Sequence, residues 1–572
     1  MKIFRARVWK RFMDIARPFW FGEERWTARG LLLLLVLLLV GYTESSVLFN
    51  KQSGELTSAL AAKDETRFWH SIYVYVGLLV VAVPLYAFFY YVRDKLAIVW
   101  RRWLTQYYLD RYFDHRSFYG LGSDAKIDNP DQRISEDINT FTQRSLNFTS
   151  IILGAIIQLI AFTSVLWNIS KVLVGFLILY AIVGTAVTTF GFGRPLVLLN
   201  FLQLKREADF RFGLVRVREN AEAIAFYRGE KSESAHVKHR FSEVFANFNK
   251  LIRCQLNLNL FQYTYSFSTY IIPAAIMAPS VLSGEREVGV VVQAAGAFSA
   301  VLAALTVFVD NFDSLSKFIA GIDRLETFRV ALAKLTTTPD PDTRIKTVEA
   351  ALIALEHVTL KTPNGQRTLV EDVSLRINPG KGLLIMGASG GGKSSVLRAI
   401  AGLWDTGSGT VQRPKLDDIL FLPQRPYMML GTLRSQLLYP NLSRDISDDE
   451  LHEVLKTVNL PLVIERLGGL DAELEWDKVL SLGEQQRIGF ARVLLTKPSY
   501  VILDEATSAL DEQNEESLYR HLADISTTLV SVGHRPTILK YHDQVLEIVG
   551  DGAWSLRAAD DEDALRVQAM TS

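Results

Sequence analysis

The sequence predicts a two-part membrane protein, in which a six-helix, all-α transmembrane domain precedes an α/β domain with a mostly parallel sheet. Three observations predict this fold class. The first half contains six long apolar segments, the second half alternates short β-rich runs with helical ones, and a glycine-rich motif joins one strand to the next helix. A polar stretch with two prolines, LTTTPDPDTR (335–344), separates the two parts.

Composition narrows the class of protein. The 572 residues are 49% hydrophobic and hold 62 basic and 62 acidic side chains, so the formal net charge is zero. A neutral, apolar chain of this length excludes a disordered tail, a collagen-like repeat and a basic nucleic-acid-binding protein. The single cysteine, Cys254, excludes an intramolecular disulfide framework and a cysteine-based zinc cluster. The charges are unevenly placed: residues 1–340 hold 38 Lys and Arg against 29 Asp and Glu, and residues 341–572 hold 24 against 33.

The apolar segments are long enough to cross a membrane. Gly30 to Gly41 reads GLLLLLVLLLVG, and about 20 helical residues cross a hydrocarbon core of ~30 Å. This first segment is too long for a cleavable signal peptide, and no small-residue cleavage site follows it. The six predicted spans lie at about 30–49, 70–92, 148–168, 172–193, 262–282 and 290–310.

The charge of the connecting segments predicts the orientation. The N-terminal segment and the connections 93–147 and 194–261 are rich in Lys and Arg, whereas the other three connections hold few. Positive residues favour the cytoplasmic side, so both termini should be cytoplasmic. Residues 1–28 are basic and aromatic, which predicts an amphipathic segment on the cytoplasmic leaflet or a plain solvated helix. No organelle-targeting extension is visible, so we expect a bacterial inner (plasma) membrane.

Three features of the membrane half are functional candidates. NPDQR (129–133) predicts a helix break followed by a new helix N-terminus. ENAEAIAFYRGE (219–230) predicts a short amphipathic helix that could dock on a soluble domain, or an ordinary loop. Glu44 lies in the outer half of the first span. Its carboxylate either lines a cavity or, if the span ends earlier, is exposed to water. The candidate docking residues are Glu219, Glu222, Ala223, Phe226, Tyr227 and Gly229.

The glycine-rich motif matches a phosphate-binding loop. GASGGGKS (387–394) fits G-x-x-x-x-G-K-[ST] between a predicted strand (383–386) and a predicted helix (395–403). Backbone N–H groups of such a loop curl round phosphates, and the helix N-terminus adds positive potential. Lys393 is expected to pair with the β- and γ-phosphates, and Ser394 to ligate Mg²⁺. The predicted ATP-binding residues are Gly387, Ala388, Ser389, Gly390, Gly391, Gly392, Lys393, Ser394 and Ser395.

A second predicted strand delivers two carboxylates. Tyr500–Leu503 is followed directly by Asp504 and Glu505, about 110 residues after the phosphate-binding loop. Ligands of open α/β sheets bind at the carboxyl ends of the strands. Asp504 therefore suits the Mg²⁺ shell, and Glu505 suits the general base that polarises the attacking water.

Together with these residues, LSLGEQQR (480–487) resembles the signature of ATP-binding-cassette (ABC) proteins. The resemblance extends through Gln424 (FLPQRPYM), SALD (508–511) and His534 (SVGHRP), in the family's order and spacing. It implies that Gln424 touches Mg²⁺ and the lytic water, that His534 contacts the γ-phosphate, and that Asp511 lies at the cassette interface. The signature residues implied to reach ATP on a second cassette are Ser481, Leu482, Gly483 and Glu484.

The sequence departs from the family's pattern at two positions. Leu482 replaces the usual first glycine of the signature, and we expect loss of precision there rather than loss of function. Thr362 stands where many cassettes place a tyrosine that stacks on adenine, so the resemblance implies weak purine selectivity.

The arrangement resembles a half-transporter with the exporter-type (type IV) membrane fold. Because an ATP site needs one cassette's phosphate loop and another's signature, the resemblance implies a homodimer. NPDQR and EAIAFYRG (222–229) resemble the subfamily D group, with its peroxisomal acyl-CoA and lysosomal cobalamin transporters and YddA-like permease–ATPase fusions. This group relates to peptide uptake proteins of the SbmA/BacA type. In it, residues 219–230 are implied to couple the membrane half to the cassette.

The expected function is therefore ATP-driven transport of a large amphipathic or hydrophobic substrate. Acyl-CoA or another lipid, cobalamin and peptide are the candidate cargoes, and the alternative is an ATP-gated channel or membrane sensor. ATP and Mg²⁺ are the expected cofactors; a second copy and the bilayer are the expected partners, and no nucleic acid is. The predicted divisions are an N-terminal segment (1–28), a transmembrane domain (29–332), a linker (333–347), a nucleotide-binding domain (348–558) and an acidic tail (559–572).

Overall fold

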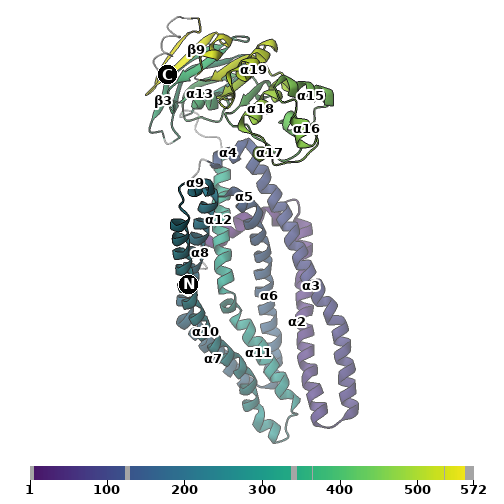
Figure 1. The fold of residues 1–572 in the computed structure, drawn as a ribbon. Coiled ribbons are helices and arrows are strands. Elements are labelled where there is room, and N and C mark those ends of the chain that lie inside the picture. The colour runs from purple at the N-terminus through teal and green to yellow at the C-terminus, as the bar shows by residue number, and fades with distance from the viewer. Residues whose placement is uncertain (1–5, 123–128, 337–343, 364, 534, 561–572) are drawn as a thin grey trace. The chain divides into compact units, whose positions relative to one another are not determined.

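The computed structural model divides the chain into two compact units, Met1–Thr337 and Thr338–Ser572. It describes residues 6–122, 129–336, 344–363, 365–533 and 535–560. Every described element of the N-terminal unit is a helix, and the C-terminal unit combines strands with helices (Figure 1). The predicted fold class, a helical membrane domain followed by an α/β domain, is confirmed.

The N-terminal unit consists of long helices and short connecting turns. Its helices are α1 (Ala6–Phe21), α2 (Arg25–Ala61), α3 (Glu65–Phe113), α4 (Ser117–Gly122), α5 (Pro130–Gln132), α6 (Ile138–Ile169), α7 (Lys171–Ala186), α8 (Arg194–Glu219), α9 (Ala221–Phe226), α10 (Glu230–Leu282), α11 (Gly289–Asp310) and α12 (Phe312–Thr336). A 3-10 turn at Asp114–Arg116 and π-helical turns at Arg133–Asp137 and Val187–Gly193 link some of them. Asn129 has a φ of 44°, so the helix break predicted at NPDQR is present.

Six helical segments are long and apolar enough to cross a membrane, as predicted. They are Arg25–Ala61, Glu65–Gly122, Pro130–Ile169, Lys171–Glu219, Glu230–Leu282 and Gly289–Val307. The 53-residue α10 measures ~80 Å at 1.5 Å per residue, far more than a hydrocarbon core of ~30 Å. Large apolar side chains stay exposed on these helices, for example Val81 (65%) and Ile271 (71%). Contiguous apolar surface of this kind is covered by lipid in a membrane protein.

Helix α1 packs against the membrane bundle through one face. Ile15, Ala16 and Phe19 are buried, and the Phe19 ring stacks on Trp100 of α3 with centroids 5.5 Å apart. Arg11 forms an ion pair with Asp323 of α12. At the edge of this face, Trp9 is 63% exposed, so it can meet a lipid headgroup layer.

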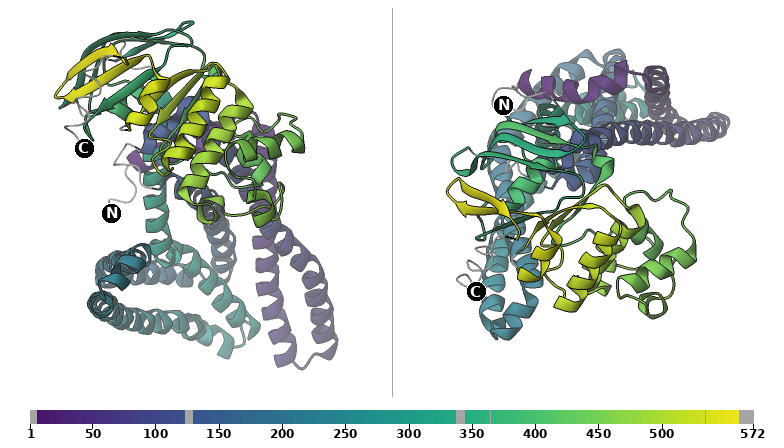
Figure 2. Two further views of the ribbon diagram at one scale, coloured as in Figure 1. Left: turned by 45° about the horizontal axis from the view of Figure 1, so that its top comes forward. Right: turned by 90° about the horizontal axis from the view of Figure 1, so that it is seen from above.

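At the end of the unit where α2 turns into α3, three helices are tied together. Arg67 pairs with Glu55 of α2 at 2.6 Å and with Glu287, which precedes α11, at 2.8 Å. A Cβ added to Gly289 would lie 1.9 Å from the carbonyl oxygen of Gly54, so α2 and α11 touch backbone to backbone. The α2–α3 hairpin otherwise extends on its own side of the unit, away from α8 and α10 (Figure 2).

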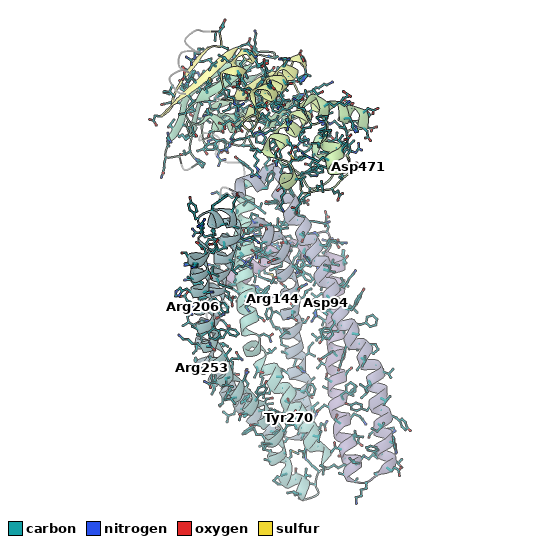
Figure 3. All side chains as sticks on the ribbon, viewed as in Figure 1. Asp94, Arg144, Arg206, Arg253, Tyr270 and Asp471 are labelled. Atoms are coloured by element: carbon teal, nitrogen blue, oxygen red, sulfur yellow. The ribbon has the colours of Figure 1, made fainter. Side chains whose placement is uncertain are left out.

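Helices α8 and α10 form an antiparallel hairpin, with Arg206 and Arg253 along it (Figure 3). Polar side chains join the two helices across their contact. Arg240 donates to the carbonyl of Asp209 at 2.8 Å, and the buried Asn247 donates to the Gln203 carboxamide at 2.9 Å. Much of the basic connection 194–261 is therefore helical, as α8 and the first part of α10.

The C-terminal unit contains two sheets. Its strands are β1 (Lys346–Glu349), β2 (Ile353–Lys361), β3 (Thr368–Ile377), β4 (Leu383–Gly387), β5 (Gly407–Arg413), β6 (Ile419–Leu422), β7 (Tyr500–Asp504), β8 (Thr528–Val532), β9 (Gln544–Gly550) and β10 (Ala553–Ala558). Its helices are α13 (Lys393–Ile400), α14 (Leu433–Leu438), α15 (Asp448–Thr457), α16 (Val463–Leu467), α17 (Trp476–Val479), α18 (Leu482–Thr496) and α19 (Glu512–Asp524), with 3-10 turns at Leu416–Asp418 and Pro536–Tyr541.

The six-stranded sheet positions the chemistry of this unit. Its order is β10-β9-β4-β8-β7-β6, and every pairing except β10 with β9 is parallel. A smaller sheet has the order β1-β5-β2-β3. Two apolar cores lie beside the six-stranded sheet, one around α14–α19 and one between the sheets around α13. Helix α13 begins two residues earlier than predicted because Gly392 takes the N-cap position.

A buried histidine makes the stability of this unit dependent on pH. The imidazole of His542 accepts a hydrogen bond from the Ser531 hydroxyl at 2.8 Å and donates one to the carbonyl of Ile538 at 2.8 Å. Burial lowers the pKa of His542 from 6.5 to about 4. Between these values the unfolded chain binds a proton that the folded unit excludes, so stability is full above pH 6.5 and falls towards pH 4, by roughly 3 kcal/mol in total.

We therefore expect the thermal unfolding temperature of this unit to fall between pH 7 and pH 5 in the wild-type protein. The variant His542→Gln should show a much smaller fall, because glutamine keeps a donor and an acceptor without titrating. The exposed His452 provides the matched control, and His452→Gln should keep the wild-type profile. An equal fall in all three proteins would contradict the assignment to His542.

Candidate functional site

The phosphate-binding loop connects β4 to α13 with a backbone that only glycine adopts easily. Gly387 has a φ of 134°, and a Cβ there would lie 2.2 Å from the carbonyl oxygen of Ile548. Gly392 has a φ of 110° and caps α13. The predicted residues 387–395 therefore form one continuous loop ending in a helix N-terminus, which suits an anionic phosphate.

The side chain of Lys393 turns back into this loop. Its ammonium donates hydrogen bonds to the carbonyls of Gly387 at 2.8 Å and Ala388 at 3.1 Å, and the residue is 6% exposed. Burial lowers the pKa of Lys393, and the charges of Glu505 and Asp504 oppose that shift. A cation held in this way stands at the centre of the loop, where phosphate oxygens can replace the carbonyls.

Asp504 ends β7, and Ser394 is the second residue of α13. The Ser394 hydroxyl donates to Asp504 Oδ1 at 2.9 Å. Burial raises the pKa of Asp504, and the Ser394 hydrogen bond opposes the rise. A hydroxyl and a carboxylate this close to a phosphate loop form the oxygen donor set that Mg²⁺ prefers. These two residues therefore fit the predicted metal role.

Glu505 and Gln424 meet beside this pair. The Gln424 carboxamide donates to Glu505 Oε2 at 3.0 Å. Glu505 has a φ of 50°, an uncommon left-handed conformation for a residue with a side chain, which costs roughly 1 kcal/mol or more. Its backbone is held by the carbonyl of Val532 on β8 at 3.2 Å. The structure thus brings together the predicted base, the predicted Gln424 and the metal pair.

The signature residues cap helix α18. The Ser481 hydroxyl accepts from the backbone N–H of Glu484, and the Glu484 carboxylate accepts from the backbone N–H of Ser481 at 2.9 Å. Glu484 also pairs with Arg466 at 2.7 Å. Leu482 is 40% exposed, and a Cβ on Gly483 would lie 3.0 Å from the carbonyl oxygen of Ala509. The signature therefore presents a helix N-terminus, while its contact with a second cassette stays a prediction.

Asp511 caps the next helix, α19. Its carboxylate accepts from the backbone N–H of Asn514 at 2.8 Å and from the Asn514 carboxamide at 3.0 Å. The backbone hydrogen bond from Asn514 lowers the pKa of Asp511. The predicted interface role of Asp511 stays a prediction.

Sequence reasoning missed a residue that joins these motifs. Gln486, 1% exposed, donates to the carbonyl of Gln424 at 2.8 Å and to the Ser508 hydroxyl at 3.2 Å. Its carboxamide oxygen accepts from the backbone N–H of Ala509 at 3.1 Å. Gln486 lies inside the quoted signature, but one helical turn beyond the cap, and only the folded structure reveals its partners.

The other predicted residues have different placements. His534 lies outside the described residues. Thr362 holds the β2–β3 turn, since its hydroxyl accepts from the backbone N–H of Arg367 at 3.1 Å. In the membrane unit, Glu44 is an exposed residue of α2. Helix α9 is short, as predicted, and Phe226 (79%) and Tyr227 (88%) are among the most exposed aromatic side chains of the described chain.

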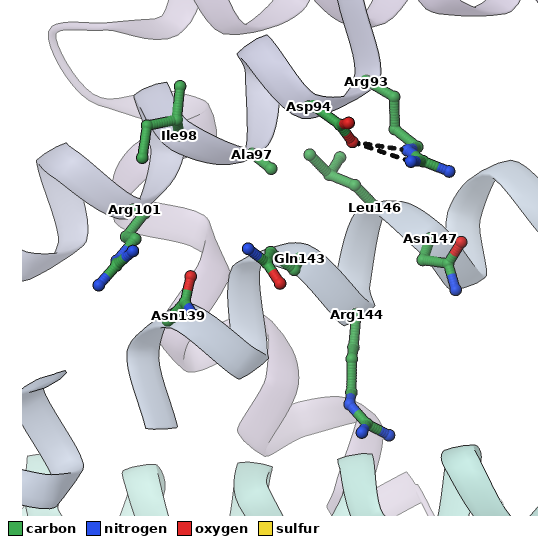
Figure 4. A pocket seen from close by; sticks show the side chains of 10 residues that line it. All are labelled: Arg93, Asp94, Ala97, Ile98, Arg101, Asn139, Gln143, Arg144, Leu146 and Asn147. Atoms are coloured by element: carbon green, nitrogen blue, oxygen red, sulfur yellow. Dashed lines mark hydrogen bonds and ion pairs between the residues drawn. The ribbon is translucent and has the colours of Figure 1, made fainter. Parts of the chain in front are cut away.

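A polar cavity of about 550 Å³ lies between α3 and α6 (Figure 4). It is lined by Arg93, Asp94, Ala97, Ile98, Arg101, Asn139, Gln143, Arg144, Leu146 and Asn147. Arg93 is neutralised by Asp94 at 2.9 Å, and Arg144 donates to the neutral carbonyl of Ser314 at 3.0 Å. Within the described part of the chain Arg101 has no acidic partner. Among the described residues, the cavity therefore carries two positive charges, Arg101 and Arg144, without an acidic partner.

The carboxamides of Asn139, Gln143 and Asn147 recur every four residues on α6, so they form a polar stripe on one wall of this cavity. The Asn139 Oδ1 atom is buried and has no hydrogen-bond partner in the described residues. A ligand hydroxyl or amide could donate to it, while an anionic group could meet the arginines.

A phosphate-binding loop, a predicted base beside a predicted metal pair, and six helices long and apolar enough to cross a membrane are the parts expected of an ATPase coupled to transport. Residues 17–282 match the family described as ABC transporter transmembrane region 2, and residues 370–508 match the family described as ABC transporter.

Three relatives cover nearly the whole chain. An uncharacterized ABC transporter ATP-binding protein of Synechocystis is 47% identical over 93% of this chain and 82% of its own length. ABC transporter D family member 2, chloroplastic, of Arabidopsis thaliana is 37% identical over 98% and 89%. The human lysosomal cobalamin transporter ABCD4 is 32% identical over 96% of each chain. The chain belongs to the ABC transporter family, with half-transporters of subfamily D among its relatives.

Proposed function

We propose that two copies of this chain form a homodimeric transporter that moves a large amphipathic, anionic substrate across a bacterial plasma membrane, with both termini in the cytoplasm. The observation that carries the proposal is the single chain's set of motifs. One phosphate loop, one base and one signature are present, so two identical cassettes facing each other would complete two equivalent ATP sites.

Each residue of the site has a defined task in this proposal. Lys393 binds the β- and γ-phosphates, and Ser394, Asp504 and Gln424 hold Mg²⁺. When bound, Mg²⁺ would neutralise charge on the transferring phosphate. Glu505 accepts the proton of the attacking water, which Gln424 touches, and His534 contacts the γ-phosphate. Ser481, Gly483 and the N-terminus of α18 meet the γ-phosphate from the facing cassette.

Helix α9 is the proposed coupling element. The exposed Phe226 at its end and Tyr227 directly after it lie at the tip of the α8–α10 hairpin, where an apolar pair can dock on a cassette. ATP binding can drive transport only if ATP binds the closed cassette pair more tightly than the open one. The coupling element then transmits the closing motion of the cassettes to the membrane helices.

The cavity between α3 and α6 favours one class of cargo among the candidates. Arg101 and Arg144 attract a phosphate or carboxylate headgroup, and Ile98 and Leu146 offer apolar contact. An acyl-CoA or a comparable anionic lipid has this chemistry. Cationic peptides would be repelled, and the sequence motifs themselves do not distinguish these cargoes.

The test is substrate stimulation of ATP hydrolysis in reconstituted proteoliposomes. We expect long-chain acyl-CoA to raise turnover at least two-fold, whereas a cationic peptide should not. Arg101→Gln should weaken the response, and Arg102→Gln, one residue away and paired with Glu24 at 3.6 Å, should preserve it.

Phe226→Ala should abolish stimulation yet keep basal hydrolysis.

Two outcomes would count against the proposal. Stimulation by the peptide alone would contradict the anionic cargo. Downhill flux that is independent of hydrolysis would favour the alternative, an ATP-gated channel.

A further inference from the structure

Helix α19 contains a buried carboxylate to which the ATP-site motifs assign no task. Glu515 is 2% exposed and lies four residues after Asp511, on the inner face of the helix. Burying a carboxylate is costly unless several donors satisfy it. The identity of its donors therefore indicates what the carboxylate holds in place.

Among the described residues, three side chains donate to Glu515, and they come from two separate segments. The Thr507 hydroxyl donates to Oε1 at 2.5 Å. The Thr537 hydroxyl donates to Oε2 at 3.0 Å, and the Arg535 guanidinium donates to the same oxygen at 3.3 Å. The guanidinium of Arg535 also donates to the carbonyl of Leu510 at 3.0 Å.

These two segments carry parts of the ATP site. Thr507 is two residues after Glu505, and Leu510 directly precedes Asp511. Arg535 and Thr537 belong to the segment that follows β8. On its other side the same 505–511 loop is held by Gln486, through Ser508 and Ala509. The loop that carries the base is thus fixed between the signature helix and α19.

We propose that Glu515 is a positioning residue for ATP hydrolysis, which sets the 505–511 loop and the segment after β8 at one fixed separation. Glu505 is held in a left-handed conformation, so its carboxylate position depends on restraints from the flanking loop. Displacing a reacting group by ~1 Å can cost 10²-fold in rate without weakening substrate binding. The inference concerns the ATPase reaction and does not depend on the cargo.

The neighbouring Glu516 provides a matched control. It lies on the same helix and also reaches the segment after β8, through an ion pair with Lys540 at 2.5 Å. Glu516 is 43% exposed, however, and none of its hydrogen bonds in the described structure reaches the 505–511 loop. If the contact between α19 and that segment mattered only for stability, substitutions of Glu515 and Glu516 would affect ATP hydrolysis equally.

The experiment measures kcat and nucleotide affinity separately in the full-length reconstituted protein. Glu515→Gln should lower kcat about ten-fold or more and change ATP affinity less than two-fold. Glu516→Gln should change kcat less than two-fold. Thermal unfolding of each variant checks that the protein is folded.

A second pair of variants keeps the test decisive if Glu515→Gln fails to fold. Thr507→Val removes one hydroxyl and should lower kcat several-fold, whereas Thr507→Ser retains the donor and should restore it. Wild-type kcat in Thr507→Val would overturn the proposal. Equal losses in the valine and serine variants, or a loss of ATP affinity that matches the loss of kcat, would also overturn it.

Discussion

Glu505→Gln should leave ATP bound and lower its hydrolysis by roughly 10²- to 10⁴-fold, the usual contribution of a general base. The substitution keeps the shape of the side chain and can keep its hydrogen bond with Gln424, now 3.0 Å long. It removes the negative charge and with it the ability to accept a proton from water. Because hydrolysis reopens the cassettes in the proposed cycle, the variant should accumulate as a closed, ATP-loaded dimer.

The measurement combines the ATP turnover rate with the nucleotide retained after free ATP is removed. Glu453→Gln is the control, since Glu453 is exposed and pairs only with Lys456 on its own helix among the described contacts. The control should hydrolyse ATP at the wild-type rate. Near-normal hydrolysis in Glu505→Gln would refute the assignment of the base.

Lys393→Ala should weaken ATP binding about 30-fold or more. Truncating one member of a buried charge pair costs roughly 2–5 kcal/mol, and 1.4 kcal/mol is a factor of ten. The Lys393 ammonium is buried at the centre of the loop, and burial lowers its pKa because the charged form is poorly solvated there. The negative phosphates of ATP would stabilise this positive charge. Removing it leaves the loop's N–H groups as the remaining phosphate donors.

ATP affinity can be measured by equilibrium binding to the purified protein. Lys381→Ala is the matched control, because Lys381 precedes β4 at its opposite end and forms an exposed ion pair with Asp543. It should bind ATP as the wild type does. Unchanged affinity in Lys393→Ala would rule out the phosphate-binding role.

The core of the ATP site could be predicted from sequence because parallel strands bring their carboxyl ends to one edge of a sheet. The strand–loop–helix pattern around Lys393 and the strand before Asp504 each have local signals. Their meeting, seen in the Ser394–Asp504 hydrogen bond, follows from the sheet order, in which one strand separates β4 from β7. No long-range information beyond the α/β pattern was needed.

The roles of Gln486 and Glu515 could not be predicted in the same way. Each is a polar residue on a helix, and its partners lie up to 62 residues away, as between Gln486 and Gln424. The cavity between α3 and α6 could not be predicted either. Arg101 and Gln143 line it from two different helices, and only the packing of those helices brings them to one cavity. Side-chain networks of this kind depend on tertiary geometry, which hydrophobic periodicity does not encode.

The length of the α8–α10 hairpin has a mechanical consequence. From Glu230 to Tyr270, before its two prolines, α10 runs ~60 Å, and cross-links such as Arg240 to Asp209 stiffen it against α8. A tilt of ~5° about one end displaces the other by ~5 Å. A shift of ~5 Å at α9 therefore needs a tilt of only ~5° about the far end of this segment, so a small movement of α9 rotates the hairpin as one stiff rod.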